Sequence, residues 1–500
     1  MLVFIIYLSK LSHTNKHLLF LSIECRLILR HPAHPTLETP VSICEKVQLK
    51  NYIKMKKTGL KWLFLLSLLI IAAIMGIAFS GPASFEIDEN VVADDTAWML
   101  TATALVLLMT PGLAFFYGGM IQSKNILSTM LQSFIAMGVI SVLWVVVGFS
   151  IAFGESVGPD GFGLFGNPLT YFMFRGVGGS CHPDLSPTIP LALFAMFQLK
   201  FAIITPALIT GSFAGRVRFR SYMLFMVLFS LFIYAPLAHW TWHPNGFLRN
   251  WGVLDFAGGT VVHMSAGFAA LAGALILGRR KDFHTDREIK PANIPFVLLG
   301  AGMLWFGWFG FNAGSALGAN STAALALMNT NTASAAAMLT WIFFDAVKGK
   351  KPSSIGASIG LVVGLVAITP AAGFVSVGSS IFIGVIAAMI SNYAITLRTK
   401  SSLDDTLDVF PAHGMGGITG MVLTAVFANE VGLIYGETTT FLYHLLALVI
   451  VGVFSFGGSW LVYKLTNVLV PLRVSAHAEK VGLDISQHDE SYDFEYKTQD

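Results

Sequence analysis

The sequence predicts an all-α protein that crosses a membrane with about eleven helices. Its 500 residues are 55% hydrophobic and only 12% charged, about half the charged share of an average soluble domain. Its mean hydropathy is +0.69. Apolar stretches of spanning length recur along the chain, and basic residues cluster in alternate loops between them. Together these observations exclude an ordinary soluble domain, and the small net charge of +3 argues against nucleic acid as a partner.

The first 83 residues are predicted to precede the membrane domain. In residues 1–54 the apolar stretch 18–29 is short and interrupted by Glu24 and Arg26, and we interpret these residues as an upstream extension that is not made, with Met55 as the initiator. Residues 55–83 have the pattern of a signal peptide, because lysines precede an apolar run and small residues at Ala78 and Ser80 would allow cleavage. The alternative is an uncleaved first span, since the run approaches the roughly 17 residues that cross a bilayer.

A membrane domain is predicted over 96–466, followed by a tail over 467–500. Its apolar segments, each long enough to span, are 97–121, 126–153, 189–213, 220–241, 256–278, 294–316, 320–346, 354–370, 373–396, 411–428 and 438–465. Lysines and arginines cluster in every second loop, and the intervening loops hold little beyond Arg175 and Arg249. By the positive-inside rule these loops and the tail are cytoplasmic, and the mature N-terminus is outside. The expected location is the inner, or plasma, membrane.

Two segments of the chain echo each other. DFAGGTVVHMSAG at 255–267 and DVFPAHGMGGITG at 408–420 each contain an acid, a histidine and a Gly-Gly pair, and they begin the fifth and tenth spans. Two five-helix halves of opposite orientation plus a final helix would follow. In transporters built this way, the binding site lies at the interface of the repeats.

The echo places His263 and His413 at matching membrane depths. Ionisable residues inside a membrane are costly and usually face a pore or a partner. Three interpretations remain open: separately satisfied polar residues, axial ligands of a haem or metal, and a polar strip in a narrow apolar pore. The matching positions favour a functional pair. Clustered carboxylates and extra histidines are missing nearby, so we expect no metal and no cofactor.

Aromatic residues and a serine lie near these histidines in the sequence pattern. Trp308, Phe311 and Ser315 are spaced three to four apart and share one face of the sixth span, and Phe201 lies in the third. Packing is the ordinary role of such a stripe, but aromatic faces with a hydroxyl also suit a cation. Asp255 has the position of a helix N-cap, worth about 1 kcal/mol, and its charge would also support a cation.

These residues resemble the ammonium transporter family, Amt/Mep/Rh, and its bacterial Amt branch in particular. The resemblance covers residues 96 to about 495. The matching stretches are TPGLAFFYGGM at 110–120, FAIITPALITG at 201–211, LDFAGGTVVH at 254–263, WFGWFGFNAGSA at 305–316 and FPAHGMGGITG at 410–420. The combination of these motifs is highly specific.

The resemblance implies a homotrimer of eleven-helix subunits, each with its own pore, and a transporter rather than an enzyme. Carried over by motif, the outer ammonium site comprises Trp242, Ser315, Phe201 and Asp255. The stacked gate comprises Phe201 and Phe311. The pore lining comprises His263, His413 and Trp308. A PII-type nitrogen regulatory protein is the implied partner at the cytoplasmic loops and tail.

An isolated cation in a low-dielectric interior costs tens of kcal/mol, whereas a cation–π contact returns only about 0.5–2 kcal/mol per ring. We therefore expect ammonium to bind outside, to lose its proton near the gate, and to pass the histidines as ammonia. Two alternatives are an ammonium sensor with little flux and an Rh-type channel for neutral gas. The short tail argues against a fused sensor, and Trp242 and Ser315 favour the ammonium-binding branch.

Two residues and one loop depart from the family pattern. Gly215 precedes Arg216 where an acidic residue is usual, which leaves an ion pair at that cytoplasmic turn open. The outer loop between Trp242 and Asp255 is slightly longer than usual. In the tail motif GLDISQHDESYDF, Asp489 stands where glycine is common.

Overall fold

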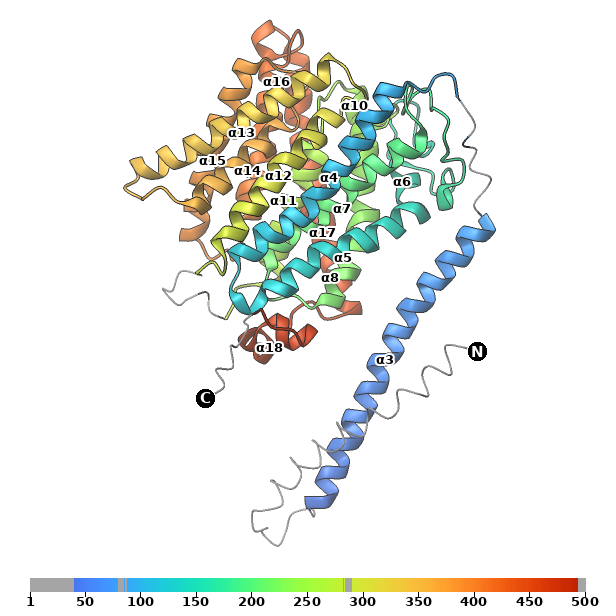
Figure 1. The fold of residues 1–500 in the computed structure, drawn as a ribbon, viewed down its shortest axis with the longest axis vertical. Helices are drawn as coiled ribbons and strands as arrows, with labels where there is room; N and C mark the ends of the chain where they lie inside the picture. Colours follow the sequence, from blue (N-terminus) through green and yellow to red (C-terminus); the bar gives the residue numbers. More distant parts are fainter. Residues whose placement is uncertain (1–39, 80–84, 86–87, 282, 284–289, 493–500) are drawn as a thin grey trace. The chain divides into compact units, whose positions relative to one another are not determined.

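The computed structural model describes residues 40–79, 85, 88–281, 283 and 290–492 (Figure 1). The chain divides into two compact units, Met1–Ala78 and Phe79–Asp500. Helix α3 (Pro40–Phe79) accounts for the described part of the first unit, and its stretch Trp62–Phe79 is long and apolar enough to cross a membrane. Most of the predicted upstream extension, and Ser80 of the cleavage pattern, lie outside the described residues.

The second unit contains a helix at each predicted span. Among the described residues, ten helices including Trp62–Phe79 are long and apolar enough to cross a membrane, and α13 and the shorter α14 complete the set. The spans are α4 (Ala93–Met120), α5 with α6 (Ile126–Leu143, Phe149–Phe153), α7 (Leu191–Phe213), α8 with α9 (Phe219–Phe229, Ala235–Trp242), α11 (Ser265–Leu277), α12 (Ile294–Gly314), α13 (Ser321–Val347), α14 (Ser354–Ile368), α15 (Val377–Lys400), α16 (Met415–Phe427) and α17 (Thr438–Leu469).

Short elements complete these spans and their loops. Single π-helical segments lie within the second and fourth spans and begin the fifth and tenth: η3 (Trp144–Gly148), η5 (Ser230–Tyr234), η6 (Gly259–Met264) and η7 (Phe410–Gly414). The connecting elements are η2 (Ser123–Asn125), the antiparallel pair β1 (Ser156–Val157) and β2 (Phe165–Gly166), η4 (Phe172–Phe174), α10 (Phe247–Asn250) and η8 (Leu433–Tyr435). The tail forms α18 (Ala476–Val481) and η9 (Asp484–His488).

Glycines let the first and sixth spans pack against each other in opposite directions. A Cβ on Gly119, at the end of α4, would lie 2.6 Å from the Asn293 carbonyl oxygen that precedes α12. A Cβ on Gly310, near the end of α12, would lie 2.6 Å from Leu105 Cβ and 2.7 Å from the Ala102 carbonyl oxygen. This close antiparallel packing confirms two halves of opposite orientation. Small residues are the usual means of such approach in membranes.

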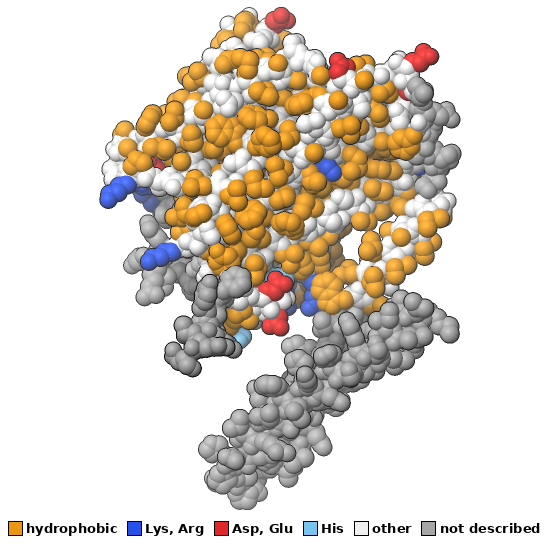
Figure 2. All heavy atoms as spheres, in the orientation of Figure 1, with side chains coloured by type: hydrophobic (Ala, Val, Ile, Leu, Met, Phe, Trp, Pro, Cys, Tyr) orange, Lys and Arg blue, Asp and Glu red, His pale blue; other side chains and the backbone are white. Residues whose placement is uncertain are grey.

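On the face of the second unit that Figure 2 presents, apolar side chains cover most of the coloured surface. Leu298 and Phe306 on α12 are 49% and 55% exposed, and Val449 and Leu461 on α17 are 62% and 69% exposed. Apolar surface of this extent would favour aggregation in water. Together with the spanning helices, it identifies a multi-pass membrane protein.

The second unit has two opposite ends, which we call the tail face and the vestibule face. The tail face carries α18 and the basic loops around Lys124, Arg216 and Arg280, which contact the tail, and the vestibule face carries the loop over 154–188 (Figure 1). The tail packs on the tail face, where Asp484 accepts the N–H groups of Leu127 (3.0 Å) and Ser128 (2.7 Å) at the start of α5.

The tail also reaches the second half of the domain. Tyr492 accepts a hydrogen bond of 2.8 Å from the side chain of Asn293, which caps α12. Asp489 has φ 58°, in the left-handed region. Glycine adopts this backbone conformation most easily, which explains why the family pattern commonly has glycine at this position.

The turn at Arg216 contains an ion pair although Gly215 replaces the usual neighbouring acid. The buried Arg216 guanidinium donates to the Asp404 carboxylate and to the Asp404 and Ser212 carbonyl oxygens (2.8 and 2.7 Å). Arg280 pairs with the same carboxylate at 2.7 Å. Burial on its own would raise the pKa of Asp404, but the two guanidinium groups hold it below its ordinary value. The acid comes from 188 residues further along the chain.

Candidate functional site

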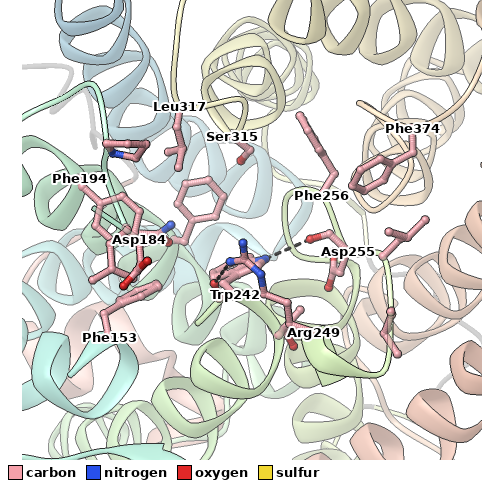
Figure 3. Close-up of a pocket in the computed structure, with 18 residues that line it drawn as sticks. Phe153, Asp184, Phe194, Trp242, Arg249, Asp255, Phe256, Ser315, Leu317 and Phe374 are labelled. Carbon is pink, nitrogen blue, oxygen red and sulfur yellow. Dashed lines mark hydrogen bonds between the residues drawn. The ribbon is translucent and has the colours of Figure 1, made fainter. Parts of the chain in front are cut away.

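A cavity of about 360 Å³ opens on the vestibule face, and the predicted outer site lies in its wall (Figure 3). Trp242, Phe201, Ser315 and Asp255 all line it. The Trp242 and Phe201 rings are 5.8 Å apart and nearly perpendicular, at 81°. Trp242 ends α9 and is held from two sides: its Nε1 donates to the Asp255 carbonyl oxygen (3.1 Å), and its carbonyl oxygen accepts from Arg249 (2.6 Å). Two aromatic faces therefore border one cavity.

Ser315 follows the last residue of α12 and lines the same cavity. Its hydroxyl donates to the Phe311 carbonyl oxygen at 2.9 Å. A hydroxyl has one hydrogen and two acceptor lone pairs. Because the hydrogen is used within the helix, Ser315 Oγ is left as an acceptor for an incoming N–H group.

The carboxylate of Asp255 is occupied by its own chain. One oxygen accepts from the N–H groups of Gly258 (2.8 Å) and Gly259 (2.6 Å), and the other from the N–H (2.7 Å) and hydroxyl of Thr260. The turn requires Gly258 at φ 120°, a conformation closed to other residues. Asp255 thus acts as the helix cap at the start of the fifth span, and it builds the vestibule wall.

Phe201 and Phe311 lie between the vestibule and the histidines. Their ring centroids are 4.2 Å apart, and the side chains are 1% and 0% exposed. The Phe311 ring is also 5.3 Å from Trp308 and 6.2 Å from His263. The ring pair therefore connects the cavity, which Phe201 lines, to His263, which Phe311 contacts.

His263 and His413 meet in the interior, 1% and 3% exposed. Their Nδ1 atoms are 3.3 Å apart, and their ring centroids 5.4 Å. Two glycines, each four residues after a histidine, allow this approach. A Cβ on Gly267 would lie 2.3 Å from the Gly414 nitrogen, and one on Gly417 would lie 3.2 Å from His263 Cβ. The two spans therefore cross in nearly direct backbone contact beside the histidines.

Thr369 determines which nitrogens carry hydrogen. Its hydroxyl donates to the Leu365 carbonyl oxygen (2.7 Å), so its oxygen accepts from Trp308 Nε1 (2.9 Å) and from His263 Nε2 (3.4 Å). For a hydrogen bond to Thr369, His263 must carry its hydrogen on Nε2, which leaves its Nδ1 as an acceptor. For a hydrogen bond between the neutral rings, His413 Nδ1 must be the donor. The Nε2 of His413 is left as an acceptor.

A smaller cavity lies on the other side of the histidines. It is lined by His413 together with Tyr117, Met120 and Asp408, among others. Vestibule, aromatic pair, histidine pair and this inner cavity follow one another through the second unit. The arrangement places an aromatic-lined cavity at one end and two hydrogen-bonded imidazoles in the middle.

The structure brings all the predicted site residues together, and it shows neighbours that sequence reasoning missed. Nothing in the sequence around Thr369 marks it as a site residue, whereas the spacing of Asp405 from His413 does. Asp405 lies eight residues before His413, as Asp255 does before His263, and its carboxylate accepts from Phe410 N at 2.7 Å. The sequence echo had matched Asp255 with Asp408 instead. Asp408 pairs with Arg398 at 2.7 Å, so Asp405 is the structural counterpart of Asp255.

Comparison with known proteins gives consistent results. The model of the Ammonium Transporter Family matches residues 97–492. An ammonium transporter of Aquifex aeolicus is 48% identical over 425 residues, which cover 83% of this chain and 97% of that protein. The crystal structure of Saccharomyces cerevisiae Mep2 superposes with a TM-score of 0.73 at 33% identity, over 78% of this chain and 89% of that one. A structure named Sensor Amt Protein matches with a TM-score of 0.71 at 30% identity, covering 79% and 98%.

Proposed function

Because the chain belongs to the Ammonium Transporter Family and is thus an ammonium transporter, we propose that it binds ammonium in the vestibule and passes ammonia between its buried histidines. The observation that carries this proposal is the order of groups along one path. Aromatic faces and a free acceptor oxygen at Ser315 come first, then the closed ring pair, then two hydrogen-bonded neutral imidazoles. Each group suits a different form of the substrate.

The cation is recognised at the entrance. Ammonium would donate to Ser315 Oγ and rest against the faces of Trp242 and Phe201, where cation–π contact contributes about 0.5–2 kcal/mol per ring. Beyond these rings the surroundings are apolar, and an unpaired cation there would cost far more than such contacts return. The proton is therefore passed to a water molecule in the open cavity before Phe201 and Phe311, and the neutral molecule continues. Net charge transfer would require a separate route for the proton.

The same groups would discriminate against potassium. Ser315 Oγ and the imidazole nitrogen acceptor reward a molecule that donates hydrogen bonds, which a potassium ion cannot do. Deprotonation at the gate is likewise closed to potassium. Selectivity would thus arise from hydrogen-bond donation and from proton loss rather than from ionic size.

Replacement of His263 by aspartate tests the proposal. The purified variant and the wild type would be reconstituted into liposomes, with methylammonium uptake, ammonium-dependent current and internal pH recorded together. We expect uptake to collapse in His263→Asp, because a carboxylate replaces the neutral ring beside His413. Potassium should produce no current in either protein. Normal ammonium-dependent current in the variant would contradict the role of the histidines.

The same recordings separate the two other functions considered. An ammonium sensor would bind ammonium with little flux, and a channel for neutral gas would change internal pH without current. The likeness to a structure named Sensor Amt Protein makes the first worth testing. The free acceptor at Ser315 beside Trp242 supports the ammonium-binding transporter.

The proposed setting of the domain follows from its charges. We place the protein in the inner, or plasma, membrane with its tail face in the cytoplasm. We expect it to form a homotrimer. A PII-type regulator would dock on the tail over 467–500. Residues 55–83 would be a cleaved signal peptide and 1–54 an upstream extension. Mass spectrometry of the mature N-terminus would contradict this if it detected peptides from 1–54.

A further inference from the structure

We propose that Asp184 and Gln198 form a second cation subsite in the vestibule, which collects ammonium before it reaches Trp242 and Ser315. The proposal rests on the proposed function and names two further residues that set its affinity. Both side chains line the same cavity as Trp242 (Figure 3). Asp184 belongs to the loop that ends at α7, and Gln198 lies one helical turn before Phe201.

Asp184 carries a charge that its own chain does not use. Its N–H donates to His182 Nδ1 at 3.3 Å, but no described residue donates a hydrogen bond to its carboxylate. In Asp255, by contrast, both oxygens are occupied by backbone and threonine donors. Of these two carboxylates in the cavity wall, Asp184 is therefore the one whose oxygens can face a cation.

Gln198 supplies a buried amide without a fixed partner. The side chain is 8% exposed, and its Oε1 has no hydrogen-bond partner among the described residues. Buried polar atoms are nearly always hydrogen-bonded. Rotation of the amide exchanges its oxygen and nitrogen, so nothing in the described residues prevents the oxygen from turning towards a cation in the cavity. An ammonium ion would supply the missing donor.

Arg249 limits the attraction that Asp184 exerts. The two side chains line the same cavity, and their charges interact. Arg249 also holds the Trp242 carbonyl oxygen at 2.6 Å, which fixes the guanidinium beside the aromatic site. A positive charge there repels ammonium, so Asp184 and Arg249 act on its affinity with opposite signs.

The expected effect is modest because the vestibule is open to water. Two unit charges about 7 Å apart in water interact by about RT, which corresponds to a two- to three-fold change in affinity. Salt at about 0.15 M shortens the screening length to about 8 Å and reduces the effect. A two- to three-fold increase in KM at low ionic strength, shrinking as salt is added, is thus the signature of Asp184.

The test measures methylammonium uptake into proteoliposomes at low and high ionic strength. Asp184→Asn should raise KM two- to three-fold at low salt with unchanged maximal rate, Asp184→Glu should restore it, and Arg249→Gln should lower it. Gln198→Leu should raise KM at every salt concentration, because it removes a hydrogen-bond acceptor rather than a charge. Asp160→Asn is the matched control, since Asp160 makes the same charge change in the same exposed loop region outside the cavity.

A second readout separates this proposal from the proposed function. Ammonium titrations followed by tryptophan fluorescence of the same purified proteins report binding without transport. Weaker binding in Asp184→Asn and Gln198→Leu would support the subsite even if the wild type showed no flux, an outcome that would overturn the transport mechanism alone. Unchanged KM and binding in both variants, or an equal shift in Asp160→Asn, would overturn the subsite and leave the transport mechanism standing.

Discussion

Replacing Gly267 by alanine should separate the two histidines. The new Cβ would lie 2.3 Å from the nitrogen and 2.4 Å from the Cα of Gly414, and 3.1 Å from the carbonyl carbon of His413. Non-bonded heavy atoms pack at roughly 3.5–4.0 Å, so the backbone of η7 must retreat by more than about 1 Å. The contacted atoms belong to the main chain, and no side-chain rotation relieves the overlap.

The magnitude follows from the contacts that such a shift breaks. Overpacking costs about 1–3 kcal/mol, and loss of the hydrogen bond between the Nδ1 atoms, now 3.3 Å apart, costs about 1 kcal/mol more. We therefore expect the variant to unfold with about 2–4 kcal/mol less free energy and to lose most of its methylammonium uptake. Thermal unfolding in detergent and uptake into proteoliposomes measure the two effects.

A matched control is available in the second span. A Cβ on Gly138 would meet no atom within 4 Å, so Gly138→Ala makes the same change without the clash. It should leave both measurements near those of the wild type. If Gly267→Ala transported and unfolded like the wild type, the contact between the two spans could not be what positions the histidines.

Two further substitutions test the entrance and the tail face. Ser315→Ala should raise the KM for ammonium about tenfold or more, because a hydrogen bond to a charged group is worth about 1.5–3 kcal/mol; Ser315→Thr, which keeps the hydroxyl, should not, and equal KM values in both would contradict the site. Asp404→Asn should lower the free energy of unfolding by about 3–5 kcal/mol, because it strands the buried Arg216. Asp160→Asn is its control, because Asp160 is exposed, and it should cost less than about 0.5 kcal/mol. Since the pKa of Asp404 lies below its ordinary value, its contribution should persist down to about pH 4 and disappear only as pH falls through that lowered pKa.

Much of the fold could be predicted from the sequence because a bilayer constrains spanning helices in a few simple ways. Each span must be apolar over a fixed length, and basic loops alternate with others, so the helices are visible as composition alone. The site residues could be predicted for a related reason. His263 and His413 are polar in segments where polarity is costly, and such residues stand out without any knowledge of their contacts.

The remaining features depend on contacts between distant segments. The partner of Arg216 is Asp404, 188 residues away, and the absence of a neighbouring acid gave no hint of it. Thr369 is one of many threonines, and only its position between Trp308 and His263 distinguishes it. Asp255 and Asp405 could have been matched from the sequence, because each lies eight residues before a histidine. Asp408, which is nearer to His413, was matched with Asp255 instead.

The single hydroxyl hydrogen of Thr369 gives the interior a polarity. With that hydrogen directed at Leu365, His263 donates from Nε2 to Thr369, His413 donates from Nδ1 to His263, and the open lone pair is at His413 Nε2. A proton arriving at His263 finds no vacant nitrogen, because Nε2 already holds hydrogen and Nδ1 is engaged. A proton arriving at His413 finds one. For His263 to accept a hydrogen bond at Nε2 instead, both rings must exchange tautomers and the Thr369 hydroxyl must turn away from Leu365, so the resting pair offers its vacant acceptor at the His413 end alone.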